Sequence, residues 1–237
     1  DIIIGNSTHL NWWEGSQKTL LDFFDTHLKT DKEVNKTSSF KHKKIWNLSL
    51  KKWDLIEEDK IHYYKFGLES NGTANVEIID GSLLFNSIGS GWFSIVHDPW
   101  RPCQGDGGHL GPNPGLFNRY IFDKRLDVGV FQTNSFEEDL QLSGIPVLET
   151  SVKSDKKSFD ICLALSLVNE HDKTVNQFST GFLRVKNLQR DEKCDCKISM
   201  HPTNITILKG TKLRLSISAA AYPAIGVNSG FGDDMLG

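Results

Sequence analysis

Residues 159–168 read FDICLALSLV, and this stretch decides the fold class. Its odd-numbered positions are all apolar: Phe159, Ile161, Leu163, Leu165 and Leu167. The positions between them form a more mixed set: Asp160, Cys162, Ala164 and Ser166. Apolar residues at every second position are typical of a β-strand with one buried face. Residues 213–218, LRLSIS, show the same alternation, so we predict a strand at each of the two stretches.

Shorter β-like segments surround these two strands. They lie at 61–66, 129–131, 145–150, 181–185 and 205–208. The dipeptides Asn71-Gly72 and Asp80-Gly81 are typical of turns. Many short strands at this spacing are typical of sandwiches and jelly rolls. We therefore predict a mainly β fold, a jelly-roll β-sandwich, over residues 61–237.

The composition is that of an ordinary globular protein. The chain has 237 residues, of which 38% are hydrophobic and 24% charged, with a formal net charge of −3. This balance argues against a disordered chain and against the basic surface of a nucleic-acid partner. No apolar run approaches the roughly 18 residues of a transmembrane helix, so no membrane partner is expected either.

The N-terminal segment has a different texture. Residues 1–4 form a short apolar run, which predicts a buried strand, and a polar and aromatic loop with His9 follows. Ser16 is a plausible N-cap for a helix whose apolar face carries Leu20, Leu21, Phe24 and Leu28. We assign this strand, loop and helix to residues 1–45, and the charged residues 46–60 to a linker. Because the chain opens inside a strand without an initiating Met, we expect it to be a fragment of a longer protein.

Residues 97–118 are rich in Gly and Pro and predict a long loop with a specified path. Four residues in it could be metal ligands: His97, Cys103, Asp106 and His109. Turn chemistry explains Asp106 and the glycines better. Cys194 and Cys196 form a C-x-C, but zinc sites space their ligands differently and need two more. We therefore expect inert, reduced thiols and neither a metal nor a cofactor.

His9 is the best catalytic candidate. In α/β-hydrolases the catalytic His comes last in chain order, after Ser and Asp or Glu, just beyond a late strand of the sheet. His9 fits that position, but the chain contains no G-x-S-x-G nucleophile motif. A loop His that only makes a local hydrogen bond therefore remains the alternative.

Five N-x-S/T sequons occur, at Asn6, Asn35, Asn47, Asn71 and Asn204. They matter only in a secreted protein, and no signal peptide is visible, so we expect a cytoplasmic location.

Several stretches resemble, in order, the C-terminal domain of X-prolyl dipeptidyl-peptidases, which also occurs in cocaine-esterase-type acyl esterases and α-amino-acid ester hydrolases. Residues 98–102 leading to Gly107-Gly108 are similar to the D-P-x-x-P-x-x-x-G-G loop of this family. Further matching stretches are 144–148 (GIPVL), 154–168 with Asp155 and Asp160, 181–184 (GFLR), 209–218 (KGTKLRLSIS), and Tyr222-Pro223 followed by Asn228-Ser229-Gly230. Residues 224–227 (AIGV) replace a more basic family stretch.

The first segment resembles the same family. Residues 4–9 (IGNSTH) are similar to the G-P-W-x-H stretch that carries the catalytic His, although Ser7-Thr8 stands in place of Pro-Trp. Residues 23–28 (FFDTHL) resemble the helix that follows it. The resemblance thus covers nearly the whole chain.

The resemblance implies a jelly-roll, galactose-binding-like domain preceded by the last piece of an α/β-hydrolase domain. The parent would be a serine hydrolase acting on a small ester or Xaa-Pro peptide, with His9 as the triad base. The partner of the jelly roll would be the N-terminal hydrolase domain of the same protein, whose substrate cleft it shapes. This chain alone would be inactive, and a homo-oligomer is left open. The alternative is a stand-alone jelly-roll module that binds carbohydrate through Trp92, Trp100 and the Gly-rich loop.

Overall fold

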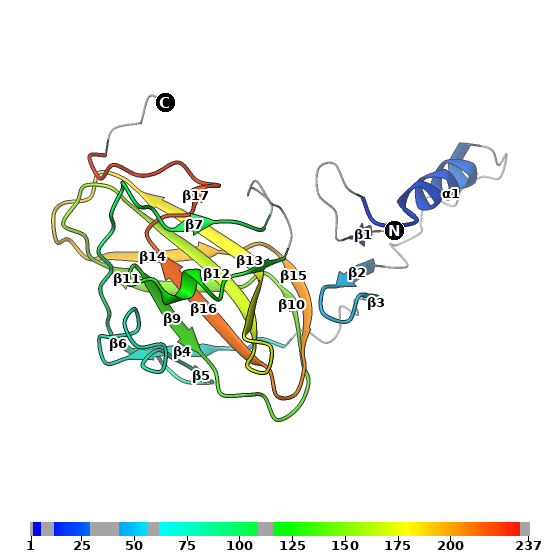
Figure 1. The fold of residues 1–237 in the computed structure, drawn as a ribbon. Helices are drawn as coiled ribbons and strands as arrows, with labels where there is room; N and C mark the ends of the chain where they lie inside the picture. Colours follow the sequence, from blue (N-terminus) through cyan, green and yellow to red (C-terminus); the bar gives the residue numbers. More distant parts are fainter. Residues whose placement is uncertain (1, 6–11, 29–42, 56–61, 109–115, 233–237) are drawn as a thin grey trace. The chain divides into compact units, whose positions relative to one another are not determined.

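A computed structural model describes residues 2–5, 12–28, 43–55, 62–108 and 116–232. The chain divides into two compact units, residues 1–62 and 63–237 (Figure 1). We describe each unit by itself. None of the helices in these described ranges combines the length and the apolar character needed to cross a bilayer.

The described part of the first unit contains one helix and three strands. Strand β1 (Ile2–Ile4) pairs in parallel with β2 (Lys43–Asn47), and β2 pairs antiparallel with β3 (Lys52–Leu55). Helix α1 (Ser16–Leu28) follows Gly15, whose φ of 86° turns the chain into it. The predicted strand at 1–4 and the predicted helix from Ser16 are therefore present.

The range 46–60, which we predicted to be a linker, contains part of a β-hairpin. Trp46 in β2 lies directly across from Trp53 in β3, with their ring centroids 5.3 Å apart. The Asn47 side chain closes the turn, because its Oδ1 accepts the Leu50 N–H at 3.1 Å and its Nδ2 donates to Asp54 Oδ2 at 2.8 Å. The boundary between the two units falls after residue 62, close to the predicted start of the sandwich.

The second unit is almost entirely β. Its longer strands are β4 (Phe66–Ser70), β5 (Ser82–Phe85), β9 (Val128–Gln132), β10 (Leu140–Gly144), β11 (Val147–Val152), β12 (Phe159–Asn169), β13 (Thr174–Val185), β14 (Cys194–Ser199), β15 (Thr203–Ile207) and β16 (Lys212–Ser218). Its two-residue strands are β6 (Ser90–Gly91), β7 (Gln104–Gly105), β8 (Phe117–Asn118) and β17 (Tyr222–Pro223), and η1 (Phe122–Lys124) is a single 3-10 turn. The prediction of a strand at 61–66 was wrong, because β4 begins only at Phe66.

Eight of these strands form one sheet in the order β6-β4-β5-β9-β16-β12-β13-β8. Two antiparallel pairs, β10-β15 and β11-β14, lie on one face of it (Figure 1). The main hydrophobic core contains residues of both layers: Ile161, Leu163 and Leu165 from β12 pack with Ile198 of β14 and Ile207 of β15. The apolar alternation in residues 159–168 therefore fills the core, and the predicted β-sandwich is confirmed.

The opposite face of the eight-stranded sheet is also covered, although its side chains are small or polar. Its central residues are Cys162, Ala164, Ser166, Arg214, Ser216 and Ser218, and all of them are buried. A smaller cluster of Cys103, Val128, Val130 and Ala220 lies there too. Residues 103–107 of the predicted loop and residues 220–225 after β16 lie over this polar face.

The predicted Asp80-Gly81 turn holds an ionised carboxylate. Asp80 accepts hydrogen bonds from the Ser70 hydroxyl at 2.5 Å and from the backbone N–H groups of Asn71 and Thr73 at 2.9 and 3.0 Å. The Ser70 hydrogen bond, followed by that of Asn71, lowers the pKa of Asp80 to about 2.

The low pKa of Asp80 predicts a pH dependence. A carboxyl whose pKa is lower when folded stabilises the fold above its unfolded value of about 3.9, and this contribution is lost as the pH falls towards 2. A carboxyl-carbon NMR titration should therefore find Asp80 titrating near pH 2. In Ser70→Ala the midpoint should move towards 3.9, and an unmoved midpoint would remove Ser70 as the main cause.

Candidate functional site

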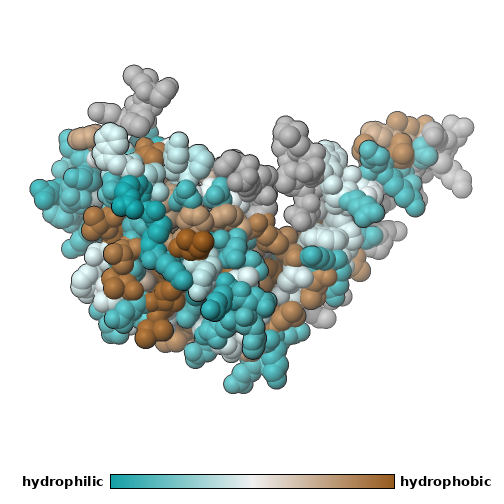
Figure 2. All heavy atoms as spheres, viewed as in Figure 1, coloured by the Kyte–Doolittle hydropathy of each residue, from teal (hydrophilic) through white to brown (hydrophobic). Residues whose placement is uncertain are grey.

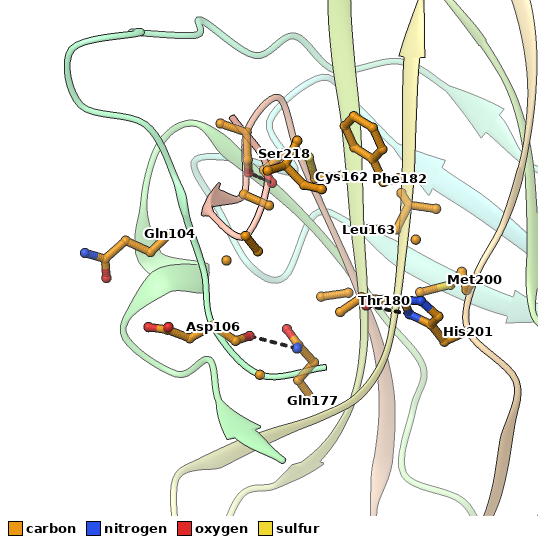
Figure 3. Close-up of a pocket in the computed structure, with 18 of the residues that line it drawn as sticks. Gln104, Asp106, Cys162, Leu163, Gln177, Thr180, Phe182, Met200, His201 and Ser218 are labelled. Carbon is orange, nitrogen blue, oxygen red and sulfur yellow. Dashed lines mark hydrogen bonds between the residues drawn. The ribbon is translucent and has the colours of Figure 1, made fainter. Parts of the chain in front are cut away.

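A pocket of about 260 Å³ opens on the polar face of the eight-stranded sheet (Figure 3). Strands β12 and β13 form its floor, and the segments around β7 and β17 form its walls. Most of the wall is apolar, with Ala164, Phe182, Met200 and Ile225 among its residues. Concave, mostly apolar surfaces with a few polar groups are where ligands bind, so this pocket is the place to look for chemistry.

The polar side chains of the pocket are bonded to one another. Gln177 Nε2 donates to the Asp106 carbonyl at 3.0 Å, and its Oε1 accepts from Arg119 Nη1 at 3.0 Å. Thr180 Oγ1 lies 2.9 Å from His201 Nδ1. Figure 3 shows Asp106 and Gln177 at one end of the pocket and Cys162 and Ser218 at the other. The bonds of Gln177 fix the shape of the pocket, and Thr180 and His201 form a hydroxyl–imidazole pair in its wall.

Cys162 is the one thiol in the pocket wall. Burial, together with the nearby Asp160 carboxylate, raises the pKa of the Cys162 thiol far above its ordinary value. Since the thiolate is the reactive form of cysteine, Cys162 is held in its unreactive form.

A buried charged network lies beside the pocket. Asp123, in η1, accepts hydrogen bonds from Arg119 Nε at 3.1 Å, Arg214 Nη1 at 3.2 Å and Ser216 Oγ at 2.9 Å. The Asp123 side chain is 0% exposed, and those of Arg119 and Arg214 are 5% and 8% exposed. Because Arg119 also holds Gln177, this network connects η1 to the pocket floor.

A second buried carboxylate fixes the segment after β16. Asp160 accepts a bidentate pair of bonds from Arg184, both at 2.8 Å, and a third from Asn228 Nδ2 at 2.7 Å. Arg184 also donates to the Gly226 carbonyl at 2.6 Å. Residues 226–228 are therefore tied to β12 and β13 at the pocket's rim, next to Ala224 and Ile225 of its wall.

The structure describes only some of the sequence-predicted site residues. His9 and His109 lie outside the described residues. Cys103 is buried in the smaller apolar cluster, whereas Asp106 lines the pocket. Across residues 2–5, 12–28, 43–55, 62–108 and 116–232, no three His, Cys, Asp or Glu side chains are grouped so that they could hold a metal.

The two tryptophans of the carbohydrate alternative are exposed. Trp92 is 68% exposed, and its ring lies against Gly72. Trp100 is 92% exposed, and its backbone N–H donates to Asp98 Oδ1. Two sequons are excluded as glycan sites in the folded chain, because Asn47 and Asn204 are 1% and 2% exposed.

Sequence reasoning missed Gln177, Arg119 and Asp123, which build the pocket and its support. No short motif marks them. The one available signal is Arg214 itself. An Arg on a buried strand needs a carboxylate partner, and Asp123 is that partner in the structure.

Solved structures similar in fold to this chain include an aminopeptidase and two ester- or CocE/NonD-type hydrolases. The chain matches an aminopeptidase from a marine sediment archaeon, Thaumarchaeota archaeon, with a TM-score of 0.74 and 16% identity over 97% of this chain and 43% of that one. It matches an α-amino acid ester hydrolase with a TM-score of 0.73 and 17% identity over 97% of this chain and 44% of that one. A CocE/NonD family hydrolase from Staphylococcus aureus follows with a TM-score of 0.53 and 14% identity over 93% and 41% of the two chains. At these identities the likeness concerns the fold.

Residues 26–235 match the family described as the X-Pro dipeptidyl-peptidase C-terminal non-catalytic domain. The chain belongs to this family, as its sequence motifs predicted. A search of curated proteins finds no match. The chain spans less than half the length of the solved structures that it matches. The carbohydrate-binding alternative receives no support from these comparisons.

Proposed function

We propose that this chain is the C-terminal part of a serine hydrolase that cleaves a small ester or an Xaa-Pro peptide bond. A catalytic domain that precedes it would supply the nucleophilic Ser and the triad carboxylate. His9 would act as the triad base, taking the Ser proton during attack and returning it to the leaving group. The sandwich itself would be non-catalytic, as the family description states.

One observation carries this proposal: 97% of this chain aligns with each of two hydrolases, but the aligned part is only 43% and 44% of their own length. The uncovered part of such proteins has room for a catalytic domain. The missing G-x-S-x-G motif fits the same proposal, because the nucleophile would lie in that part.

The exposed apolar surface of the first unit supports the proposal that a catalytic domain packs against it. On α1, Leu20, Leu21, Phe24 and Leu28 are 43–76% exposed. Figure 2 shows this hydrophobic surface on the helix. An amphipathic helix normally buries its apolar stripe against the domain to which it belongs. We propose that this helix and β1-β2-β3 complete the sheet and helix layers of the catalytic domain.

The sandwich would pack on that catalytic domain and shape its substrate cleft. Large apolar side chains that are more than half exposed occur on it as well, including Ile79, Ile88, Leu116 and Ile121. Exposed apolar side chains of this size are available for contact with a neighbouring domain. We also propose a cytoplasmic location, because all four cysteines are free.

The mass of the endogenous protein tests this proposal. An antibody raised against this chain should detect a band of more than twice the 26.7 kDa of the chain, since the hydrolases it matches are more than twice as long. The purified protein should hydrolyse p-nitrophenyl esters or Xaa-Pro anilides, and the 237-residue chain alone should not. A single band near 26.7 kDa would contradict the proposal.

A further inference from the structure

Cys194 and Cys196 stand side by side on β14. Alternate residues of a strand point to the same face, so both side chains face the hydrophobic core of the sandwich. Cys196 is buried there, and Cys194 is half-buried against the same core. Their two sulfur atoms are only 3.7 Å apart.

A metal does not explain this pair. Within the ranges that the structure describes, no third His, Cys, Asp or Glu joins them to form a ligand set. Asp195, between them, belongs to the other face of the strand, where its carboxylate accepts from the Ser151 hydroxyl and lies 3.7 Å from Lys193 Nζ. A tetrahedral zinc site needs four ligands. The chemistry open to the two sulfurs is therefore with each other.

A disulfide requires β14 to bend at Asp195. Residues two apart on a strand have Cα atoms about 6.6 Å apart, inside the range of about 4.4–6.8 Å that disulfides join, but their parallel Cβ atoms are about as far apart, whereas a disulfide holds its Cβ atoms about 3.5–4.5 Å apart. The sulfurs would have to move from 3.7 Å to a bond of about 2.05 Å. Disulfides at the edge of the allowed geometry are more easily reduced than relaxed ones, and such bonds are labile or regulatory.

We propose that Cys194 and Cys196 are an oxidation site at which a small-molecule disulfide converts the two thiols into an intrastrand disulfide. This inference does not depend on the proposed hydrolase function. It gives the C-x-C motif a chemical role that neither catalysis nor packing requires.

The reaction has two exchange steps. Cys194, the more exposed thiol, loses its proton and attacks the small-molecule disulfide, which forms a mixed disulfide and releases one thiol. Cys196 then loses its proton and attacks the Cys194 sulfur, which closes the intrastrand bond and releases the second thiol. Two protein thiols are oxidised and one small disulfide is reduced to two thiols.

The order of the two steps follows from burial. Burial, and then the hydrogen bond with Cys194, raises the pKa of Cys196 to about 11. Cys196 is therefore the poorer first attacker at neutral pH. It acts second, on a sulfur already beside it, and the closing step should become faster as the pH rises.

Oxidised glutathione and tryptic mass spectrometry test the proposal on the unmodified chain. Trypsin cuts after Lys193 and Lys197, so the peptide of residues 194–197, CDCK, holds both thiols apart from Cys103 and Cys162. After oxidation and alkylation in denaturant, this peptide should be lighter by two hydrogens and should carry no alkyl group. Dithiothreitol should restore two alkylatable thiols.

Two variants make the result specific. In Cys196→Ser, the mixed disulfide on Cys194 should accumulate, because no neighbouring thiol can resolve it. In Cys162→Ser, the matched control, the 194–197 disulfide should form as in the unmodified chain. The proposal is overturned if the unmodified chain keeps both thiols alkylatable, stops at the mixed disulfide, or links Cys194 to a second chain.

Discussion

Replacing Asp123 by Ala should lower the free energy of unfolding of the sandwich by about 3–5 kcal/mol. Asp123 is fully buried and is the acceptor shared by Arg119, Arg214 and Ser216. Removing the carboxylate leaves two guanidinium groups, 5% and 8% exposed, without their counter-charge. The cost of leaving buried charges unpaired exceeds the cost of losing the hydrogen bonds themselves.

Urea unfolding of the unmodified chain and the variant measures this loss as a shift of the midpoint at constant m-value. Asp155→Ala is the matched control, because Asp155 forms an ion pair with Lys156 in which both side chains are 62% exposed. That pair should contribute little to stability, so the control should have the same urea midpoint as the unmodified chain. If Asp123→Ala has the same urea midpoint as the control, the network does not stabilise the sandwich.

Three residues from the family motifs contact one another in the structure. Asp160, Arg184 and Asn228 come from three separate stretches of sequence, and the structure joins them in one buried cluster with bonds of 2.7–2.8 Å. Sequence could show that these residues match a family pattern. It could not show that they contact one another, because the number of residues between them does not give their distance in space.

The alternation of apolar and polar residues predicted the sandwich because it reports which face of a strand is buried. It failed for the second layer, where Arg214 and Ser216 are buried on a face that the pattern presents as polar. Charged residues are rarely buried without a partner, and the partner here, Asp123, lies 91 and 93 positions away. The pocket beside this network was therefore beyond reach of the sequence alone.

The β2-β3 hairpin escaped notice for a related reason. Its strands are only five and four residues long, and Lys43, Lys44, Lys51 and Lys52 give them the texture of a solvated segment. The signals that could have found it are Trp46 and Trp53, which pair across the strands, and Asn47, which caps the turn.

Replacing His9 by Ala in the intact hydrolase should lower kcat by about 10⁴–10⁶-fold, with a much smaller change in KM. The proposed role of His9 is to carry the Ser proton in both acylation and deacylation, so its loss affects the transition states and not the binding of substrate. In the unmodified enzyme kcat/KM should fall as the pH is lowered, because a protonated His cannot act as a base.

His171→Ala is the control for this experiment, since His171 is exposed in the turn between β12 and β13. It should retain full activity and thereby exclude a general effect of losing an imidazole. Equal melting temperatures for the two variants would show that His9→Ala is folded. If folded His9→Ala keeps its kcat within about tenfold of the unmodified enzyme, another group is the base, because a true triad base contributes far more. The hydrolase proposal would survive that result, since it rests on the family match and on the part of the hydrolases that this chain does not cover.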